Sequence, residues 1–216
     1  MRRLFLAVAA FVAVAAVAAR GVAQDTRLLS IRDAAVRTLV MRQLSGARSR
    51  GFTVEQSEPL LAKALQGVAM QAPPNKIRDA METLEKRMRR AAELLAPHAT
   101  VDEVTAGADA LAARAPASAL REMRKLAPNR SITVELGVLT ELLAKGVPPK
   151  RAAQRVRDVM ARGGTGAQLT ELNSAVQQDV AAGLRPEAAL ELRVRAVMSL
   201  LPPPPSVLTA SPKSPP

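Results

Sequence analysis

Apolar residues recur three or four positions apart along most of this chain, the spacing that places side chains on one face of an α-helix. The clearest segment is residues 73–95, whose apolar positions are Ile77, Met81, Leu84, Met88, Ala91 and Leu95. The same spacing returns over residues 148–162 and 186–201, and all three segments begin with proline. Because proline lacks the N–H that a first helical turn leaves unpaired, these segments are predicted to be proline-led amphipathic helices.

A second kind of helix is predicted to begin at a threonine. Thr53, Thr100 and Thr165 are each followed, three positions later, by a side chain with a terminal carbonyl: Gln56, Glu103 and Gln168. This is the capping-box pattern, in which the two side chains satisfy unpaired backbone N–H groups at the start of a helix. Thr133 keeps only the first half of the pattern.

The threonine-led and proline-led helices alternate four times over residues 51–201. The helix-starting prolines Pro74, Pro116, Pro149 and Pro186 are 42, 33 and 37 residues apart. A period of about 37 residues that contains two helices is typical of α-hairpin repeats. We therefore predict an all-α, irregular α-hairpin repeat array of about four hairpins. An irregular helical bundle is the alternative, and the residues match no named repeat family.

The first residues have the pattern of a secretory signal peptide. Met1 and two arginines precede an unbroken apolar stretch over residues 4–19, which is short for a membrane span. We predict residues 1–23 to be a signal peptide that is cleaved after Ala23, and residues 16–18 offer a second cleavage site. An uncleaved N-terminal anchor is the alternative.

The rest of the chain is predicted to form one helical domain over residues 24–201. It would start with an N-terminal helix within residues 24–50, running from about Thr26 to Ala47 and packed as a loose arm. Residues 202–216 are mostly Pro, Ser, Thr and Lys. Since such a segment can bury little apolar surface, we predict a disordered, proline-rich tail.

The predicted signal peptide directs the chain out of the cytoplasm, and the composition indicates a bacterium. Its richness in Ala and Arg is typical of a high-GC bacterial genome, so the periplasm is the first expectation and secretion the second. Cysteine is absent, which excludes disulfides, thiolate metal sites and a lipid-bearing N-terminal cysteine. Without residues 1–23, 28 basic and 19 acidic residues remain, a net charge of +9, and Phe52 is the only aromatic residue.

Charge divides between the two kinds of helix, since the threonine-led helices are acidic and the proline-led helices basic. If hairpins stack in register, the proline-led helices form one basic face that would attract an acidic protein, an anionic lipid surface or an anionic envelope polymer. A solvated face, neutralised by pairs such as Glu82 with Lys86, is the alternative. The residues of the predicted face are Lys86, Arg87, Arg89, Arg90, Arg121, Arg124, Lys125, Lys150, Arg151, Arg155 and Arg157.

Catalytic chemistry finds little support in the sequence. His98 is the only histidine, and one histidine without an acidic cluster makes no metal site. Asp102 and Glu103 are the only adjacent carboxylates, but neighbours on a helix point about 100° apart and Glu103 has a capping role. The glycine-rich residues 162–166 lack the lysine of a phosphate loop, so they are interpreted as a helix C-cap and a turn. We therefore predict no catalytic residue, metal or cofactor.

Nucleic-acid binding is not predicted either, because the stacking aromatics of single-strand binders are missing and the signal peptide directs the chain away from the genome. The sequence thus favours an exported, non-enzymatic helical binding or scaffold protein of the bacterial cell envelope, without an integral membrane span after cleavage. A cell-envelope enzyme or enzyme accessory without a recognisable motif is the alternative.

Overall fold

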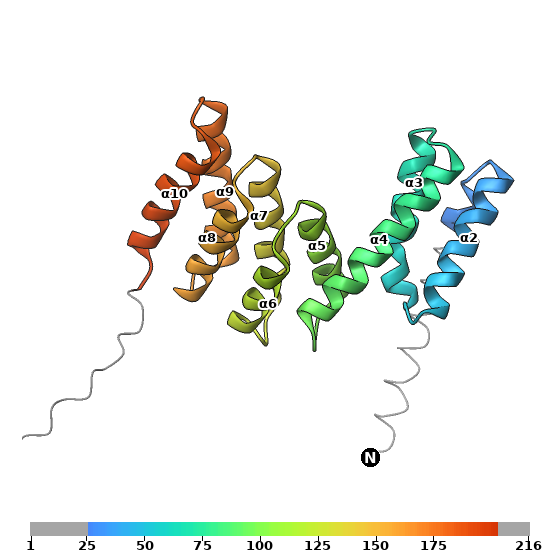
Figure 1. The fold of residues 1–216 in the computed structure, drawn as a ribbon, viewed down its shortest axis with the longest axis horizontal. Helices are drawn as coiled ribbons and strands as arrows, with labels where there is room; N and C mark the ends of the chain where they lie inside the picture. Colours follow the sequence, from blue (N-terminus) through green and yellow to red (C-terminus); the bar gives the residue numbers. More distant parts are fainter. Residues whose placement is uncertain (1–25, 203–216) are drawn as a thin grey trace, which may run out of the picture. The chain divides into compact units, whose positions relative to one another are not determined.

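The computed structural model describes residues 26–202, and every regular element described in that range is an α-helix. The predicted signal peptide and residues 203–216 of the predicted tail lie outside the described residues. The helices are α2 (Ala34–Ser49), α3 (Val54–Ala69), α4 (Pro74–Leu95), α5 (Val101–Ala112), α6 (Ala117–Leu126), α7 (Thr133–Ala144), α8 (Pro149–Ala161), α9 (Gly166–Ala181) and α10 (Pro186–Leu200) (Figure 1). Within residues 26–202 no helix is both long and apolar enough to cross a membrane.

The chain divides into two compact units, with the boundary within α4 between Arg90 and Ala91, and the single domain over residues 24–201 stays a prediction. The first unit contains α2, α3 and most of α4. Its buried side chains follow the helical spacing on each element: Val36, Val40 and Leu44 on α2, Leu60, Leu61 and Ala64 on α3, and Ile77, Met81 and Met88 on α4. These three apolar stripes form the core of the first unit.

The predicted helix from Thr26 to Ala47 is wrong in both its extent and its packing. Residues 26–29 form one helical turn, and the chain then leaves the helix until α2 begins at Ala34. Asp33 causes the new start, because its carboxylate accepts the backbone N–H groups of Ala35 and Val36 at 2.8 and 3.1 Å. Helix α2 contacts α3 and buries four apolar side chains, so it is a packed element and not a loose arm.

The second unit is built from two rows of helices. The threonine-led row contains α5, α7 and α9, in which α5 contacts α7 and α7 contacts α9. The proline-led row contains α6, α8 and α10, in which α6 contacts α8 and α8 contacts α10 (Figure 1). One continuous apolar core joins the rows and runs from Leu94 at the end of α4 to Leu201. The predicted all-α fold with helical repeats is therefore confirmed.

Capping decides where the threonine-led helices start. The boxes at Thr53, Thr100 and Thr165 are confirmed, with both reciprocal hydrogen bonds present in each. The half pattern at Thr133 does not make a cap, because the N-cap residue of α7 is Ile132 and Thr133 is already helical. The carboxylate of Glu103 on α5 accepts the Ile132 N–H at 2.9 Å instead. The start of α7 is therefore fixed by a side chain of the preceding repeat.

Candidate anion-binding surface

The arginines of α8 lie between helices and are paired with acids of the neighbouring proline-led helices. Arg155 donates two hydrogen bonds to Glu191 of α10, at 3.0 and 2.8 Å, and one to Asp158. Arg151 contacts Glu187 of α10 at 3.1 Å. On the other side of α8, Arg157 pairs with Glu122 of α6. Three residues of the predicted basic face therefore hold repeats together.

The Glu191 hydrogen bond raises the pKa of Arg155 above its ordinary value, so this guanidinium stays charged under all ordinary conditions. Arg155 and Glu191 are about one quarter and one third exposed. Their charges largely cancel at the surface that a partner would meet. The α8 arginines accordingly contribute less positive field to solvent than their number in the sequence indicates.

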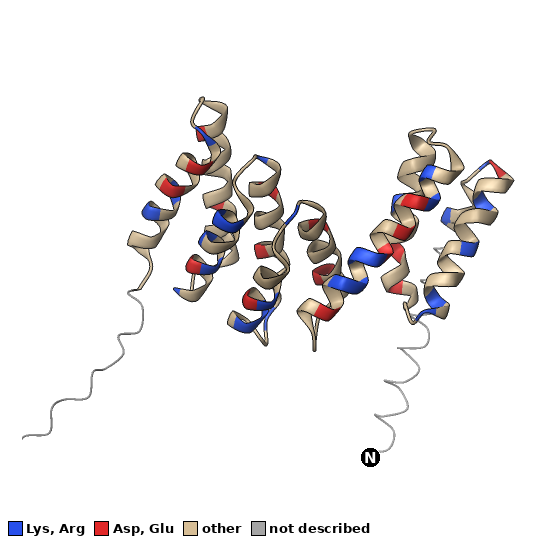
Figure 2. Cartoon of the chain, viewed as in Figure 1, with Lys and Arg blue, Asp and Glu red and all other residues tan. Residues whose placement is uncertain are grey.

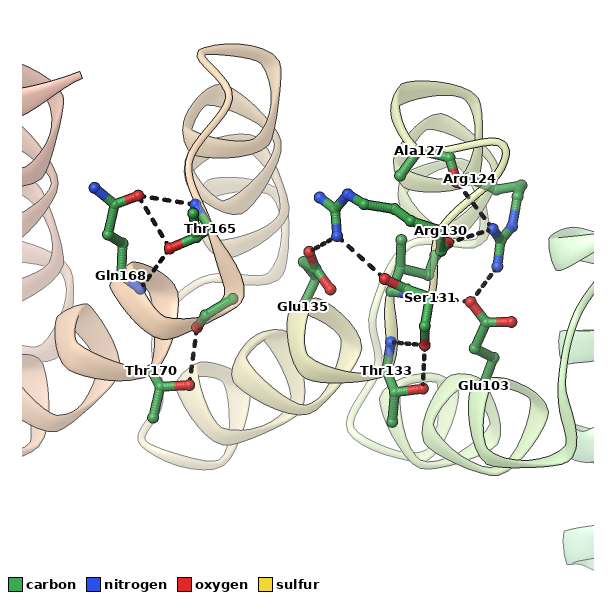
Figure 3. A network of polar contacts seen from close by, with 12 residues as sticks. Glu103, Arg124, Ala127, Arg130, Ser131, Thr133, Glu135, Thr165, Gln168 and Thr170 are labelled. Carbon is green, nitrogen blue, oxygen red and sulfur yellow. Dashed lines mark hydrogen bonds and ion pairs between the residues drawn. The ribbon is translucent and has the colours of Figure 1, made fainter. Parts of the chain in front are cut away.

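Arg124 of α6 does not lie on an exposed face, although the sequence places it there. It is 6% exposed, and its guanidinium donates to the carbonyls of Ala127 and Arg130 at 2.9 and 3.0 Å and to the carboxylate of Glu103 (Figure 3). The physical reason is its position among Leu120, Met123 and Ala127, on the buried stripe of α6. Arg124 is therefore a buried structural cation.

Glu103 is the acceptor at the centre of this network. Burial acts to raise its pKa, but the N–H groups of Thr100 and Ile132 and the Arg124 guanidinium outweigh burial, so its pKa lies below the ordinary 4.5. A carboxyl held ionised in this way is a poor proton donor. A pocket of about 330 Å³ is lined by Glu103, Arg124 and His98, the only histidine. Glu103 is engaged in structural hydrogen bonds there and not available to His98 as a catalytic partner. The arrangement fits a buried clamp between α5, α6 and α7.

A groove between α2 and α4 in the first unit brings exposed cations together. Its volume is about 490 Å³, and its lining residues are Arg42, Gln43, Gly46, Arg50, Glu82, Glu85, Lys86 and Arg89. An adjoining hollow of about 570 Å³ shares Arg42 and Gln43 with this groove and adds Arg78. Five basic side chains and two carboxylates therefore line the two hollows.

Glu85 forms the floor of the groove. Its side chain is 8% exposed and accepts two hydrogen bonds from Arg50, at 2.8 and 2.7 Å, and two from Arg89, at 3.2 and 3.0 Å. The hydrogen bond from Arg50 is the main cause that holds the pKa of Glu85 below its ordinary value. Arg89 also lies over the ring of Phe52, with 5.4 Å from the guanidinium carbon to the ring centroid. The floor is thus a rigid, doubly paired carboxylate, and Arg42 and Lys86 lie at the exposed margins.

The predicted face therefore divides into three groups by exposure. Lys86, Arg87, Arg90, Arg121, Lys125 and Lys150 are exposed; Arg89, Arg151, Arg155 and Arg157 are half-buried; Arg124 is buried. Short blocks of basic and acidic residues follow one another along α4, so both signs of charge occur on one helix (Figure 2).

Arg42 and Arg50 of the groove were not predicted from the sequence as site residues. A signal for them exists, since Arg42, Gly46 and Arg50 follow at steps of four and so share one side of α2. That side faces α4, as the Arg50 to Glu85 hydrogen bonds demonstrate. Comparisons with models of protein families, with curated proteins and with solved structures find no match to this chain.

Proposed function

We propose that this protein is an exported, non-enzymatic helical binding or scaffold protein of the bacterial cell envelope, which engages an anionic partner through the groove between α2 and α4. The observation that carries the proposal is the lining of that groove by four cations against two carboxylates, with Arg78 as a fifth cation in the adjoining hollow. One carboxylate, Glu85, is buried beneath the arginines that it orients. An anionic group that approaches the groove would then meet Arg42 and Lys86 first, at the exposed margin.

Four further parts of the proposal come from the sequence. Residues 1–23 act as a signal peptide cleaved after Ala23, the mature protein is periplasmic or secreted, and residues 202–216 remain a disordered tail. The repeat has a period of about 37 residues. Contacts of Arg151 with Glu187, of Arg155 with Glu191 and of Arg162 with the Met198 carbonyl support this period, because each joins residues 36 apart.

The partner class is defined by the anionic groups that such a groove would hold. Phosphate or carboxylate groups of a lipid surface, an envelope polymer or an acidic protein all accept hydrogen bonds from guanidinium and ammonium groups. With Phe52 packed beneath Arg89, the groove offers no free aromatic ring for stacking on a sugar or base. Recognition would therefore rest on charge and hydrogen bonds, and it would weaken as salt screens the charges.

Sedimentation with vesicles that contain anionic phosphatidylglycerol tests the proposal, with polyphosphate as a soluble probe. We expect the protein to bind both probes at low salt and to lose them steeply as salt rises. The double variant R42Q/K86Q should bind vesicles roughly 30-fold more weakly, since each cation near an anionic surface contributes about 1 kcal/mol.

The matched control is K125Q/K150Q, which removes the same charge from two exposed residues of the proline-led row. Its affinity should fall clearly less than that of R42Q/K86Q. Equal losses in both variants would show that net charge, and not the groove, determines binding. No binding of the unaltered protein to either probe would refute the proposal.

A further inference from the structure

Gly46 lies inside α2 and lines the groove between α2 and α4, although a glycine weakens a helix relative to alanine. At the helical glycines Gly67 and Gly107, an added Cβ would meet apolar side chains packed from other helices. At Gly46 it would instead lie 3.2 Å from Nη1 of Arg50, and the next nearest atoms belong to the same guanidinium. The missing side chain of Gly46 therefore leaves room beside a cation and not for helix packing.

The Nη1 group is the part of the Arg50 guanidinium that Glu85 leaves unused. Nε donates to one carboxylate oxygen of Glu85 at 2.8 Å, and Nη2 donates to the other at 2.7 Å. Within residues 26–202, Nη1 donates no hydrogen bond. Because the bidentate pair with Glu85 fixes the plane of the guanidinium, it also fixes the direction of the Nη1 donors. Arg50 thus presents an oriented, unused donor next to the space that Gly46 leaves open.

Two more donors line the same groove without a partner of their own. Arg42 of α2 and Lys86 of α4 are exposed, and neither makes a hydrogen bond or an ion pair within the described residues. Four basic side chains line the groove against Glu82 and Glu85, so the lining has two positive charges in excess. A ligand that matches this lining has two negative charges and more than two acceptor oxygens.

We infer that the groove binds a phosphate monoester group, an inference that rests on the proposed function and names the chemistry of its anionic partner. A monoester carries a charge of about −1.5 to −2 at pH 7 and has three strong acceptor oxygens. A phosphodiester or a carboxylate has one negative charge, shared by two oxygens. The donors of Arg42, Arg50 and Lys86 match the three oxygens of the monoester, and the two excess positive charges match its charge.

Vesicle sedimentation at about pH 7.5, where the monoester is mostly doubly ionised, tests the inference. Phosphatidic acid presents a monoester and phosphatidylglycerol a diester, and the lipid contents are chosen so that both kinds of vesicle have the same zeta potential. The full chain is used. Any contact of other parts of the chain with the bilayer is common to both vesicles, so the ratio of the two affinities is measured. We expect about tenfold tighter binding to phosphatidic acid, the lower end of the gain from one further hydrogen bond to a charged group.

The variant that tests the geometry is G46A, which places a Cβ beside Nη1 of Arg50 and leaves every charge unchanged. Alanine favours a helix more than glycine does, so the variant should fold, and its thermal midpoint verifies this. Its preference for phosphatidic acid should fall below about twofold, while its affinity for phosphatidylglycerol should hardly change. The matched control is G137A on α7, where the added Cβ meets nothing within 4 Å and lies outside the groove. G137A should keep the preference of the unaltered protein.

Equal affinity of the unaltered protein for both vesicles would overturn the inference and leave the proposed function standing. A full preference in G46A would also overturn it, because the space beside Arg50 would then have no part in binding. Absence of binding to either vesicle would refute the proposed function and the inference together.

A competition experiment distinguishes the two sources of a monoester. Release of the protein from phosphatidic acid vesicles by millimolar glycerol 3-phosphate would identify a soluble monoester as the ligand, and retention would identify the lipid headgroup. Both results agree with a monoester site. Release by an equal concentration of a glycerol phosphodiester would contradict the inference, since a diester should not replace the third oxygen and the second charge.

Discussion

The Arg155 guanidinium on α8 and the Glu191 carboxylate on α10 face each other through two parallel hydrogen bonds, although they lie 36 residues apart in the sequence. Bidentate pairing of this kind fixes direction as well as distance. Arg151 makes a similar but more exposed contact with Glu187 one turn earlier. The two pairs hold consecutive proline-led helices in one register.

A double-mutant cycle on Arg155 and Glu191 should reveal a coupling of about 1 kcal/mol in the free energy of unfolding, near the upper end for partly exposed pairs. The cycle on Arg151 and Glu187 should give less than about 0.5 kcal/mol, because these side chains are more exposed and share one hydrogen bond. Urea unfolding followed by helical circular dichroism measures both. Equal couplings would contradict the ranking.

Removal of Glu103, the buried carboxylate that accepts from Arg124, should lower the free energy of unfolding far more than the loss of either surface pair. We expect Glu103→Ala to lower the free energy of unfolding by about 3–5 kcal/mol, since it leaves the Arg124 charge buried without a partner. Gln168→Ala serves as the control, because Gln168 closes a capping box at the surface and its loss should cost only about 1 kcal/mol. A similar cost for both variants would mean that Glu103 acts only as a cap.

Glu85 should make the stability of the first unit depend on pH. Its pKa is lowered in the folded protein, first through the hydrogen bond from Arg50. The stabilisation is therefore present above the ordinary pKa of 4.5 and is lost as the pH falls through the lower folded-state pKa. Glu85→Gln should destabilise the protein most near neutral pH, and its difference from the unaltered protein should shrink in acid. Urea midpoints across this range provide the measurement; a constant difference would refute the role of ionisation.

Substitution by alanine should change the free energy of unfolding in opposite directions at two helical glycines. A Cβ at Gly137 meets nothing within 4 Å, so Gly137→Ala should stabilise α7 by about 1 kcal/mol through helix propensity. A Cβ at Gly107 would lie 3.0 Å from Leu95 and 3.1 Å from the Ala91 Cβ, and the crowding should outweigh the same propensity gain. Thermal unfolding of the two variants gives the comparison. A Gly107→Ala protein that is more stable than the unaltered protein would show that α4 shifts enough to accept the added Cβ.

Local signals predicted the structure best. The capping boxes at Thr53, Thr100 and Thr165 depend on side chains three residues apart, so the sequence contains all of the necessary information. The break before α2 also had a local signal in Asp33, but the continuous helical spacing on both sides concealed it. Residues 162–166 were interpreted correctly as a helix end, with Arg162 as the C-cap of α8 and Gly163 at a φ of 77°.

The candidate site was less predictable, because pairing between helices depends on tertiary packing. Nothing in the spacing of Arg157 indicates that Glu122 of another helix meets it. The burial of Arg124 was readable in principle, since it follows Leu120 by four positions, but its charge suggested exposure. Prediction of the groove lined by Arg42 and Arg50 would have required the angle between α2 and α4, and no pattern within a single helix contains this information.

The pairing of arginines on α8 with acidic side chains on both neighbouring proline-led helices has a consequence for how such a chain can change by gain or loss of repeats. Helix α8 supplies arginines to both neighbours, while α6 offers Glu122 and α10 offers Glu187 and Glu191. A deletion that removes the α7–α8 hairpin would bring acid against acid, and a tandem copy of it would bring arginine against arginine. The middle hairpin is thus not an interchangeable module, and inheritance of the whole array as one block is the expected outcome.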